Sequence, residues 1–366
     1  MNLSFIWTII SFVIVFSLMV ICHEGGHFIV ARMNGVKVYE FMIGLGPAFI
    51  KFEKWGTKFT VRALPFGGAC LFANPDEVEE DEIKKDEEEK LAEDLDNGKD
   101  KLFNNVSVFK RIAICFAGPL CNVILGYILS IIVVFFCGST GTTIYSVKDN
   151  SPAEIAGLRA GDQIIKINNE RIYLFNEIRL ISFTDKNESW TVTYLRDGNK
   201  YETVIYPRDN EELVREIGVT TKDFIDCSNM KMFKYAAYET RFSLKATFKS
   251  LRMLVTGNLS KDDVSGPVGV AQVLDDTIES TKQYGLLTVI LNLINISVLL
   301  NVNIGIVNLL PIPMFDGGKI FMYVIEGIIR KPIPEKVQGI IQGVTFVLIV
   351  LLALFITFND ITKFFR

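Results

Sequence analysis

The residues best suited to chemistry form the pentapeptide His23-Glu24-Gly25-Gly26-His27, at the end of the first long apolar run. Residues four apart share one face of a helix, so the two imidazoles can point at one spot. Two histidines at this spacing, with a glutamate beside the first, can hold a zinc ion and supply a general base for hydrolysis. The chain has only two histidines, and both lie in this motif. We predict that His23 and His27 bind zinc and that Glu24 is the base.

The setting of the motif favours a functional role. It follows twenty uncharged residues, Leu3 to Cys22. Ionisable groups are costly inside a membrane and usually serve a function there. The alternative, two structural histidines beside an exposed glutamate, fits this setting less well.

A second polar segment follows a later apolar run. Residues 301–318 contain three asparagines, two prolines and the sequence Asp316-Gly317-Gly318. Such groups would be costly in contact with lipid, so we expect a protein-lined, water-accessible cavity there. A catalytic zinc ion usually takes three protein ligands and keeps one position for water. With both histidines used, the third ligand must be Asp, Glu or Cys.

Asp316 is the carboxylate within this otherwise apolar segment, and we predict that it is the third ligand. One alternative is that Asp316 only forms a turn at a helix end. Another is a membrane zinc protease of a different type, whose third ligand would be a glutamate on a later helix; Glu326 is the nearest candidate.

Composition and length indicate a membrane protein. Of the 366 residues, 49% are hydrophobic, and the mean hydropathy is +0.31. About 20 apolar residues cross the hydrocarbon layer, and four uncharged runs are long enough: Leu3–Cys22, Ile112–Cys137, Leu286–Leu310 and Val337–Phe358. We therefore predict a multi-pass α-helical membrane protein with about four transmembrane helices. The net charge of −4 and the lack of a basic patch argue against a nucleic-acid partner,.

Basic residues in the short connections predict the orientation. Lysines and arginines gather between the first two runs and between the last two, so both connections should be cytoplasmic. The region near 138–284 would then lie outside, and His23 and His27 would lie toward the cytoplasmic side. Lys363 and Arg366, near the end of the chain, run against this assignment. The six cysteines show no CxxC pairing, so neither a disulfide framework nor a zinc ribbon is expected,.

Between the runs we expect four kinds of segment. Short β-prone pieces within 36–72 predict a small membrane-associated sheet packed on the first helix, or alternatively a cytoplasmic hairpin. The acidic tract 76–100 is assigned no chemistry. From 142 to 208 the pattern is that of an α/β module with a hairpin at Asp197-Gly198. Met230–Leu254 reads as an amphipathic helix, either at the membrane surface or as a plain connector,.

The predicted division is 1–35 (first span), 36–72 (β segment), 73–104 (acidic insert), 105–138 (second span), 142–208 (α/β module), 209–284 (amphipathic linker), 285–318 (third span) and 319–366 (loop and fourth span).

Several motifs together resemble a known family. The stretch from Pro152 to Asn168 is similar to the core of PDZ domains, which bind extended peptides by β-augmentation,. With HEGGH at 23–27, SGPVG at 265–269 and NIGIVNLLPIPMFDGG at 303–318, the chain resembles the site-2 protease family, in particular bacterial intramembrane zinc metalloproteases with a single PDZ domain outside the cytoplasm.

The resemblance implies specific roles. His23, His27 and Asp316 would bind Zn²⁺, Glu24 would be the base, and Asn303 and Asn308 match asparagines that contact substrate or stabilise the site. Phe315 stands where the family usually has leucine, and the acidic insert is unusual.

The function implied is cleavage of peptide bonds within transmembrane segments of pre-trimmed single-pass proteins, such as anti-sigma factors and signal-peptide remnants. This is regulated intramembrane proteolysis at the bacterial cytoplasmic membrane, with a PDZ domain that would bind peptide C-termini. The alternative is an inactive membrane scaffold whose PDZ domain recruits partners.

Overall fold

Four long helices dominate the chain. The computed structural model describes residues 3–72, 101–209, 215–257 and 266–364. Its long apolar helices are α1 (Leu3–Met33), α3 (Val108–Cys137), α8 (Leu286–Val307) and α10 (Glu335–Phe364). Each contains a stretch that is long and apolar enough to cross a membrane,. The predicted multi-pass helical architecture is therefore confirmed.

The chain divides into two compact units. The first comprises Met1–Leu125, Lys261–Val289 and Leu300–Arg366, and the second comprises Gly126–Ser260 and Ile290–Leu299. The predicted metal-binding residues all belong to the first unit, and the α/β module belongs to the second.

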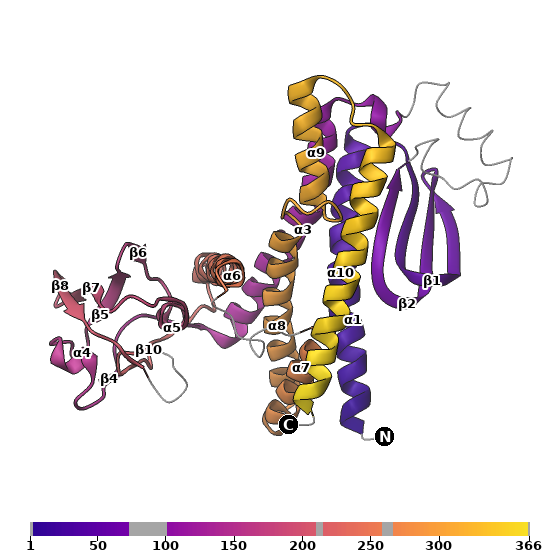
Figure 1. Cartoon of the computed structure of the whole chain (residues 1–366). Coiled ribbons are helices and arrows are strands. Elements are labelled where there is room, and N and C mark those ends of the chain that lie inside the picture. The colour runs from indigo at the N-terminus through magenta and orange to yellow at the C-terminus, as the bar shows by residue number, and fades with distance from the viewer. Residues whose placement is uncertain (1–2, 73–100, 210–214, 258–265, 365–366) are drawn as a thin grey trace, which may run out of the picture. The chain divides into compact units, whose positions relative to one another are not determined.

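The sheet of the first unit lies beside α1 (Figure 1). It is built from two long strands, β1 (Val38–Lys54) and β2 (Thr57–Phe72), where the sequence predicted three short pieces. Both strands bend, so the first part of β1 pairs with 68–72 on one side and with 58–61 on the other. The segment 48–54 pairs with the start of β2. The two outer edges of the sheet are therefore 48–54 and 68–72.

Two shorter helices, α7 (Pro267–Thr281) and α9 (Asp316–Ile329), complete the first unit with 3₁₀ turns at Phe103–Asn105 and Lys282–Tyr284. We had predicted a loop from 319 to the fourth span, and α9 corrects this. Met322, Tyr323 and Glu326 form the buried face of this helix. Glu326 pairs with Arg111 of α3 at 2.9 Å, a partner that sequence spacing does not reveal. The acidic tract 76–100 lies outside the described residues.

The α/β module of the second unit has a four-stranded antiparallel sheet in the order β6-β5-β7-β8. Its elements are β4 (Ser146–Val147), α4 (Pro152–Ile155), β5 (Gln163–Ile167), β6 (Glu170–Arg171), α5 (Phe175–Thr184), β7 (Trp190–Arg196) and β8 (Asn199–Ile205). Ser151 caps α4 by accepting a hydrogen bond from the backbone of Glu154,. Arg196 pairs with Asn199 across the predicted turn, so the Asp197-Gly198 hairpin is confirmed.

This module continues past residue 208, where we had placed its end. After β9 (Arg208–Asp209) and β10 (Arg215–Glu216), the strand β11 (Val219–Thr220) pairs with β4. Ile217 joins the core around Trp190 and Ile164. Farther on, β12 (Phe224–Ile225) pairs with β3 (Ser139–Thr140). The returning chain thus supplies both strands and core to the module.

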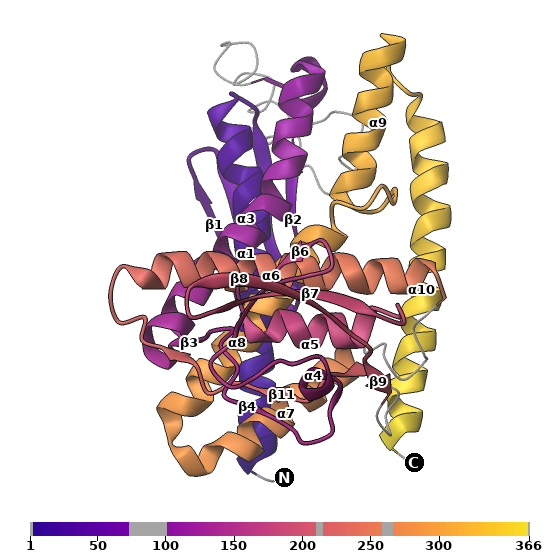
Figure 2. The same cartoon turned by 90° about the vertical axis from the view of Figure 1, so that its left-hand side faces the viewer.

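A long helix follows the module. Helix α6 (Lys231–Val255) matches the amphipathic helix expected at 230–254 and runs alongside α5 (Figure 2).

Candidate metal centre

Helix α1 presents both histidines on one face. His23 and His27 are one helical turn apart, and their Nε2 atoms lie 3.2 Å from each other. The rings meet edge to face at 82°. His27 is buried, with 7% of its surface exposed. The i, i+4 spacing of the motif has therefore produced the convergence that the sequence predicted.

Asp316 reaches the same point from the start of α9. The chain turns sharply before it, where Gly317 donates a backbone hydrogen bond to the carbonyl of Asn308 at 2.7 Å. Asp316 Oδ2 lies 3.1 Å from His23 Nε2 and 3.4 Å from His27 Nε2. The structure thus brings Asp316 to the two histidines, although it lies nearly 300 positions after them in the chain.

The separations of these donors fit a zinc ion. Zinc bonds of about 2.0–2.2 Å in a tetrahedral arrangement put ligand atoms roughly 3.3–3.6 Å apart. The three measured separations, 3.1, 3.2 and 3.4 Å, lie close to this range. Two imidazole nitrogens that face each other across such a gap also need a shared cation or proton. The donor set, two imidazoles and one carboxylate, is one that zinc takes in hydrolases.

The second nitrogen of each imidazole is also engaged. His27 Nδ1 donates to the backbone carbonyl of Ile114 at 2.8 Å, which leaves Nε2 free to bind a metal,. His23 Nδ1 lies 3.3 Å from the side-chain amide of Asn122. The atom nearest the ring is Nδ2, and the buried Oδ1 has no hydrogen-bond partner among the described residues. Turning the amide by 180° would place Oδ1 against the ring, so that His23 could donate from Nδ1 in the same way.

Asn122 is the site contact that sequence reasoning missed. The sequence alone allows either a site-facing or a helix-packing role for this residue. Its position, an amide in the middle of an apolar span, was the available signal.

Glycines allow α3 to approach the motif closely. A Cβ added at Gly118 would lie 2.2 Å from His27 Nε2, and one added at Gly26 would lie 2.5 Å from the carbonyl oxygen of Ala117. Gly25, by contrast, faces open space. Of the two glycines in the motif, Gly26 is therefore the one that a neighbouring helix requires.

Glu24 lies between α1 and the sheet. A Cβ added at Gly68 of β2 would come within 3.1 Å of Glu24 Cγ. Within the described ranges, no hydrogen bond or ion pair engages the Glu24 carboxylate. It is therefore available to a water molecule or a substrate.

The other residues considered for the site have different surroundings. Asn308 ends α8 and is tied to the Asp316 turn through its carbonyl, while Asn303 is exposed on α8. Glu326, the rival third ligand, is paired with Arg111. The Cys22 thiol donates to the carbonyl of Cys121 at 3.3 Å. Among the described residues, the cluster that could hold a metal consists of His23, His27 and Asp316.

Comparisons with known proteins agree with this chemistry. A model of peptidase family M50 matches residues 11–352. The Clostridium acetobutylicum protein CA_C1796 is 31% identical over 357 residues, covering 97% of each chain. The zinc metalloprotease RasP of Shouchella clausii is 29% identical over 98% of this chain and 99% of its own. The PDZ domain of the Listeria monocytogenes protein Lmo2051 is 24% identical over 23% of this chain and 88% of its own, with a TM-score of 0.21.

Proposed function

We propose that this chain, which belongs to peptidase family M50 and is a zinc metalloprotease with helices long and apolar enough to span a membrane, hydrolyses peptide bonds within transmembrane segments of other proteins. We also assign its α/β module as a PDZ domain. The observation that carries this proposal is the convergence of His23, His27 and Asp316 from two helices of the first unit. Both histidines lie within the candidate span Trp7–Met33, and Asp316 follows the candidate span Leu286–Val307 by nine residues.

We assign the two histidines and Asp316 as zinc ligands and Glu24 as the general base. Bound zinc would polarise the scissile carbonyl and lower the pKa of water toward about 7. Glu24 then takes a proton from the attacking water and passes it to the leaving amine. Water adds to the carbonyl carbon, the C–N bond breaks, and an acid and an amine are released. No covalent link to the enzyme forms.

Substrate binding requires local unwinding, because a transmembrane helix satisfies its peptide groups internally. An unwound segment could pair with a sheet edge as an added strand. The edge 68–72 suits this role because Gly68 lies against Glu24. This edge belongs to β2, which ends at Phe72. Asn303 and Asn308 are proposed to contact the substrate or stabilise the site.

The PDZ domain would select which substrates are admitted. A groove of about 750 Å³ lies between α5 and the strands β10 and β11, lined by apolar residues such as Ile178 and Val219 together with Arg179 and Arg215. Peptide C-termini exposed by earlier trimming are its proposed ligands. The proposed substrates are anti-sigma factors and signal-peptide remnants. We place the enzyme in the bacterial cytoplasmic membrane, with the PDZ domain outside and the metal centre toward the cytoplasm.

The direct test is Glu24→Gln in purified full-length enzyme with a single-span substrate. Cleavage should be abolished while zinc remains bound, because the amide cannot accept the proton but keeps the helix and the ligands. Retained cleavage would refute the base assignment.

A matched variant, Asp316→Asn, should lower zinc content. An inactive scaffold predicts instead that neither substitution changes any cleavage and that chelators have no effect.

A further inference from the structure

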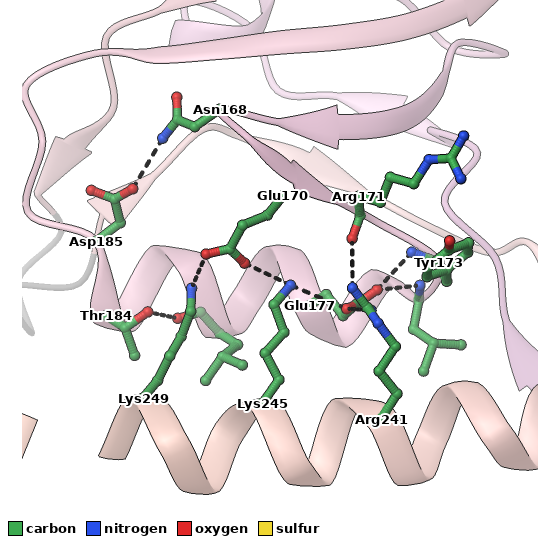
Figure 3. Close-up of polar contacts among 12 residues, drawn as sticks. Asn168, Glu170, Arg171, Tyr173, Glu177, Thr184, Asp185, Arg241, Lys245 and Lys249 are labelled. Atoms are coloured by element: carbon green, nitrogen blue, oxygen red, sulfur yellow. Dashed lines mark hydrogen bonds and ion pairs between the residues drawn. The ribbon is translucent and has the colours of Figure 1, made fainter. Parts of the chain in front are cut away.

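Ion pairs hold helix α6 against the PDZ domain (Figure 3). Glu177 of α5 is fully buried and contacts Arg241, and it lies 3.2 Å from Lys245 Nζ. Glu170 pairs with Lys245 at 2.6 Å and with Lys249 at 3.1 Å. In this part of the helix, every inward cation therefore meets a carboxylate.

Toward its N-terminus, the same helix covers a cavity in which cationic side chains have no carboxylates beside them. This cavity, of about 410 Å³, lies between α6 and the outer face of the sheet. We call it the cationic pocket. Its lining includes four cationic side chains and no carboxylate: Lys166, Arg171, Lys200 and Lys234. Four positive charges around one hollow give it a positive potential that favours the entry of an anion.

These cations are not neutralised elsewhere. None of the four makes an ion pair with any residue that the structure describes. The guanidinium of Arg171 points away from the ion pairs (Figure 3). The nearest acid along the sheet is Glu202, cross-strand from Thr193, but it does not line the pocket. The surplus charge is therefore a property of the pocket itself.

Three tyrosines supply further donors. Tyr173 and Tyr238 stack with centroids 4.3 Å apart, and Tyr235 meets Tyr238 edge to face at 5.6 Å. Lys234 lies over both α6 rings, 5.9 Å from Tyr235 and 5.7 Å from Tyr238. Within the described part of the chain, no hydrogen bond involves any of the three hydroxyls. Free hydroxyls and ammonium groups together match the oxygens of a phosphate.

The pocket is near the end of a membrane span. The Tyr127 hydroxyl donates to the carbonyl of Phe233, next to Lys234, at 3.3 Å. More directly, Thr142 lines the pocket and follows Cys137, the last residue of span α3, by only five positions. The pocket is therefore tied closely in sequence to the end of a span, where lipid headgroups begin.

We propose that the cationic pocket binds a phosphate-bearing anion and that anionic phospholipid headgroups supply it. Occupation would offset part of this positive charge and would tether the start of α6 to a lipid headgroup. The site is separate from the metal centre and needs no turnover to be detected.

The test uses full-length protein in neutral detergent, with native mass spectrometry of bound lipid. Dioctanoyl phosphatidylglycerol should bind more tightly than dioctanoyl phosphatidylcholine. Lys166→Gln with Lys200→Gln should weaken phosphatidylglycerol binding by roughly tenfold or more. The control, Lys148→Gln with Lys186→Gln, removes the same charge from exposed positions outside the pocket and should bind as the wild type does.

A parallel arm uses sn-glycerol 3-phosphate. If sn-glycerol 3-phosphate binds the wild type weakly and does not bind the pocket variant, the result would support the site, with the lipid as its ligand. Binding as tight as that of the lipid would reject the lipid as the source. Equal phosphatidylglycerol affinity in the pocket variant and the control would overturn the proposal. Lys234→Gln, a second pocket variant, should also weaken phosphatidylglycerol binding.

Discussion

Gly118→Ala should disturb the metal centre through a single methyl group. The added Cβ would lie 2.2 Å from His27 Nε2, whereas ordinary contact begins near 3.4 Å. The shortfall is about 1.2 Å, several times the roughly 0.2 Å by which a zinc–ligand distance can vary. Retreat of helix α3 would stretch the 2.8 Å hydrogen bond from His27 Nδ1 to the carbonyl of Ile114 on that helix. The His27 ring must therefore move, and one of three ligands leaves its position.

We expect zinc affinity to fall by more than the 10–100-fold that loss of a ligand's hydrogen-bond partner costs. Overpacking should also lower stability by about 1–3 kcal/mol. The assay is elemental zinc per folded protein after size-exclusion chromatography, followed by a chelator titration. Gly343→Ala, on a helix position with open space around it, is the matched control and should keep its zinc. A Gly118→Ala enzyme with wild-type zinc content and chelator resistance would refute the reasoning.

Two further substitutions test contacts around the site and in the second unit. Asn122→Leu removes the partner of His23 Nδ1 while keeping similar volume, so zinc affinity should fall 10–100-fold; unchanged affinity would make Asn122 a packing residue only. Burial raises the pKa of Glu239, and the hydroxyl of Ser139 only partly offsets this. Because the pKa of Glu239 is higher in the folded than in the unfolded protein, the protonated carboxyl stabilises the fold at pH values below its ordinary pKa of about 4.3. This stabilisation is lost as the pH rises through the raised pKa of the folded state. Glu239→Gln should therefore melt higher than wild type at pH 7 and nearly equally at pH 4, and a lower melting temperature at pH 7 would contradict this.

The sequence predicted the histidine pair because its geometry is local: the i, i+4 spacing put His23 and His27 on one helix face. Asp316 was predicted for another reason, as a carboxylate in an otherwise apolar segment, and the fold brings it to the histidines. Apolar run length predicted the four spans for a similar reason, since bilayer thickness fixes the number of residues required.

What the sequence did not predict depends on contacts between distant segments. Helix α9 is stabilised by burial of one face and by the Arg111–Glu326 pair. The α/β module of the second unit needs Ile217 for its core, and this residue follows an interruption in the strand pattern. The role of Asn122 depended on which way one face of α3 points, and a uniformly apolar helix gives no periodicity from which to infer this.

The ligand set itself can be measured by zinc K-edge X-ray absorption on the purified full-length enzyme. We predict two imidazole nitrogens at about 2.0–2.1 Å and carboxylate or water oxygen at about 2.0–2.2 Å, with the carboxylate contribution lost in Asp316→Asn. A sulfur shell near 2.3 Å, or a spectrum unchanged by Asp316→Asn, would contradict the proposed centre.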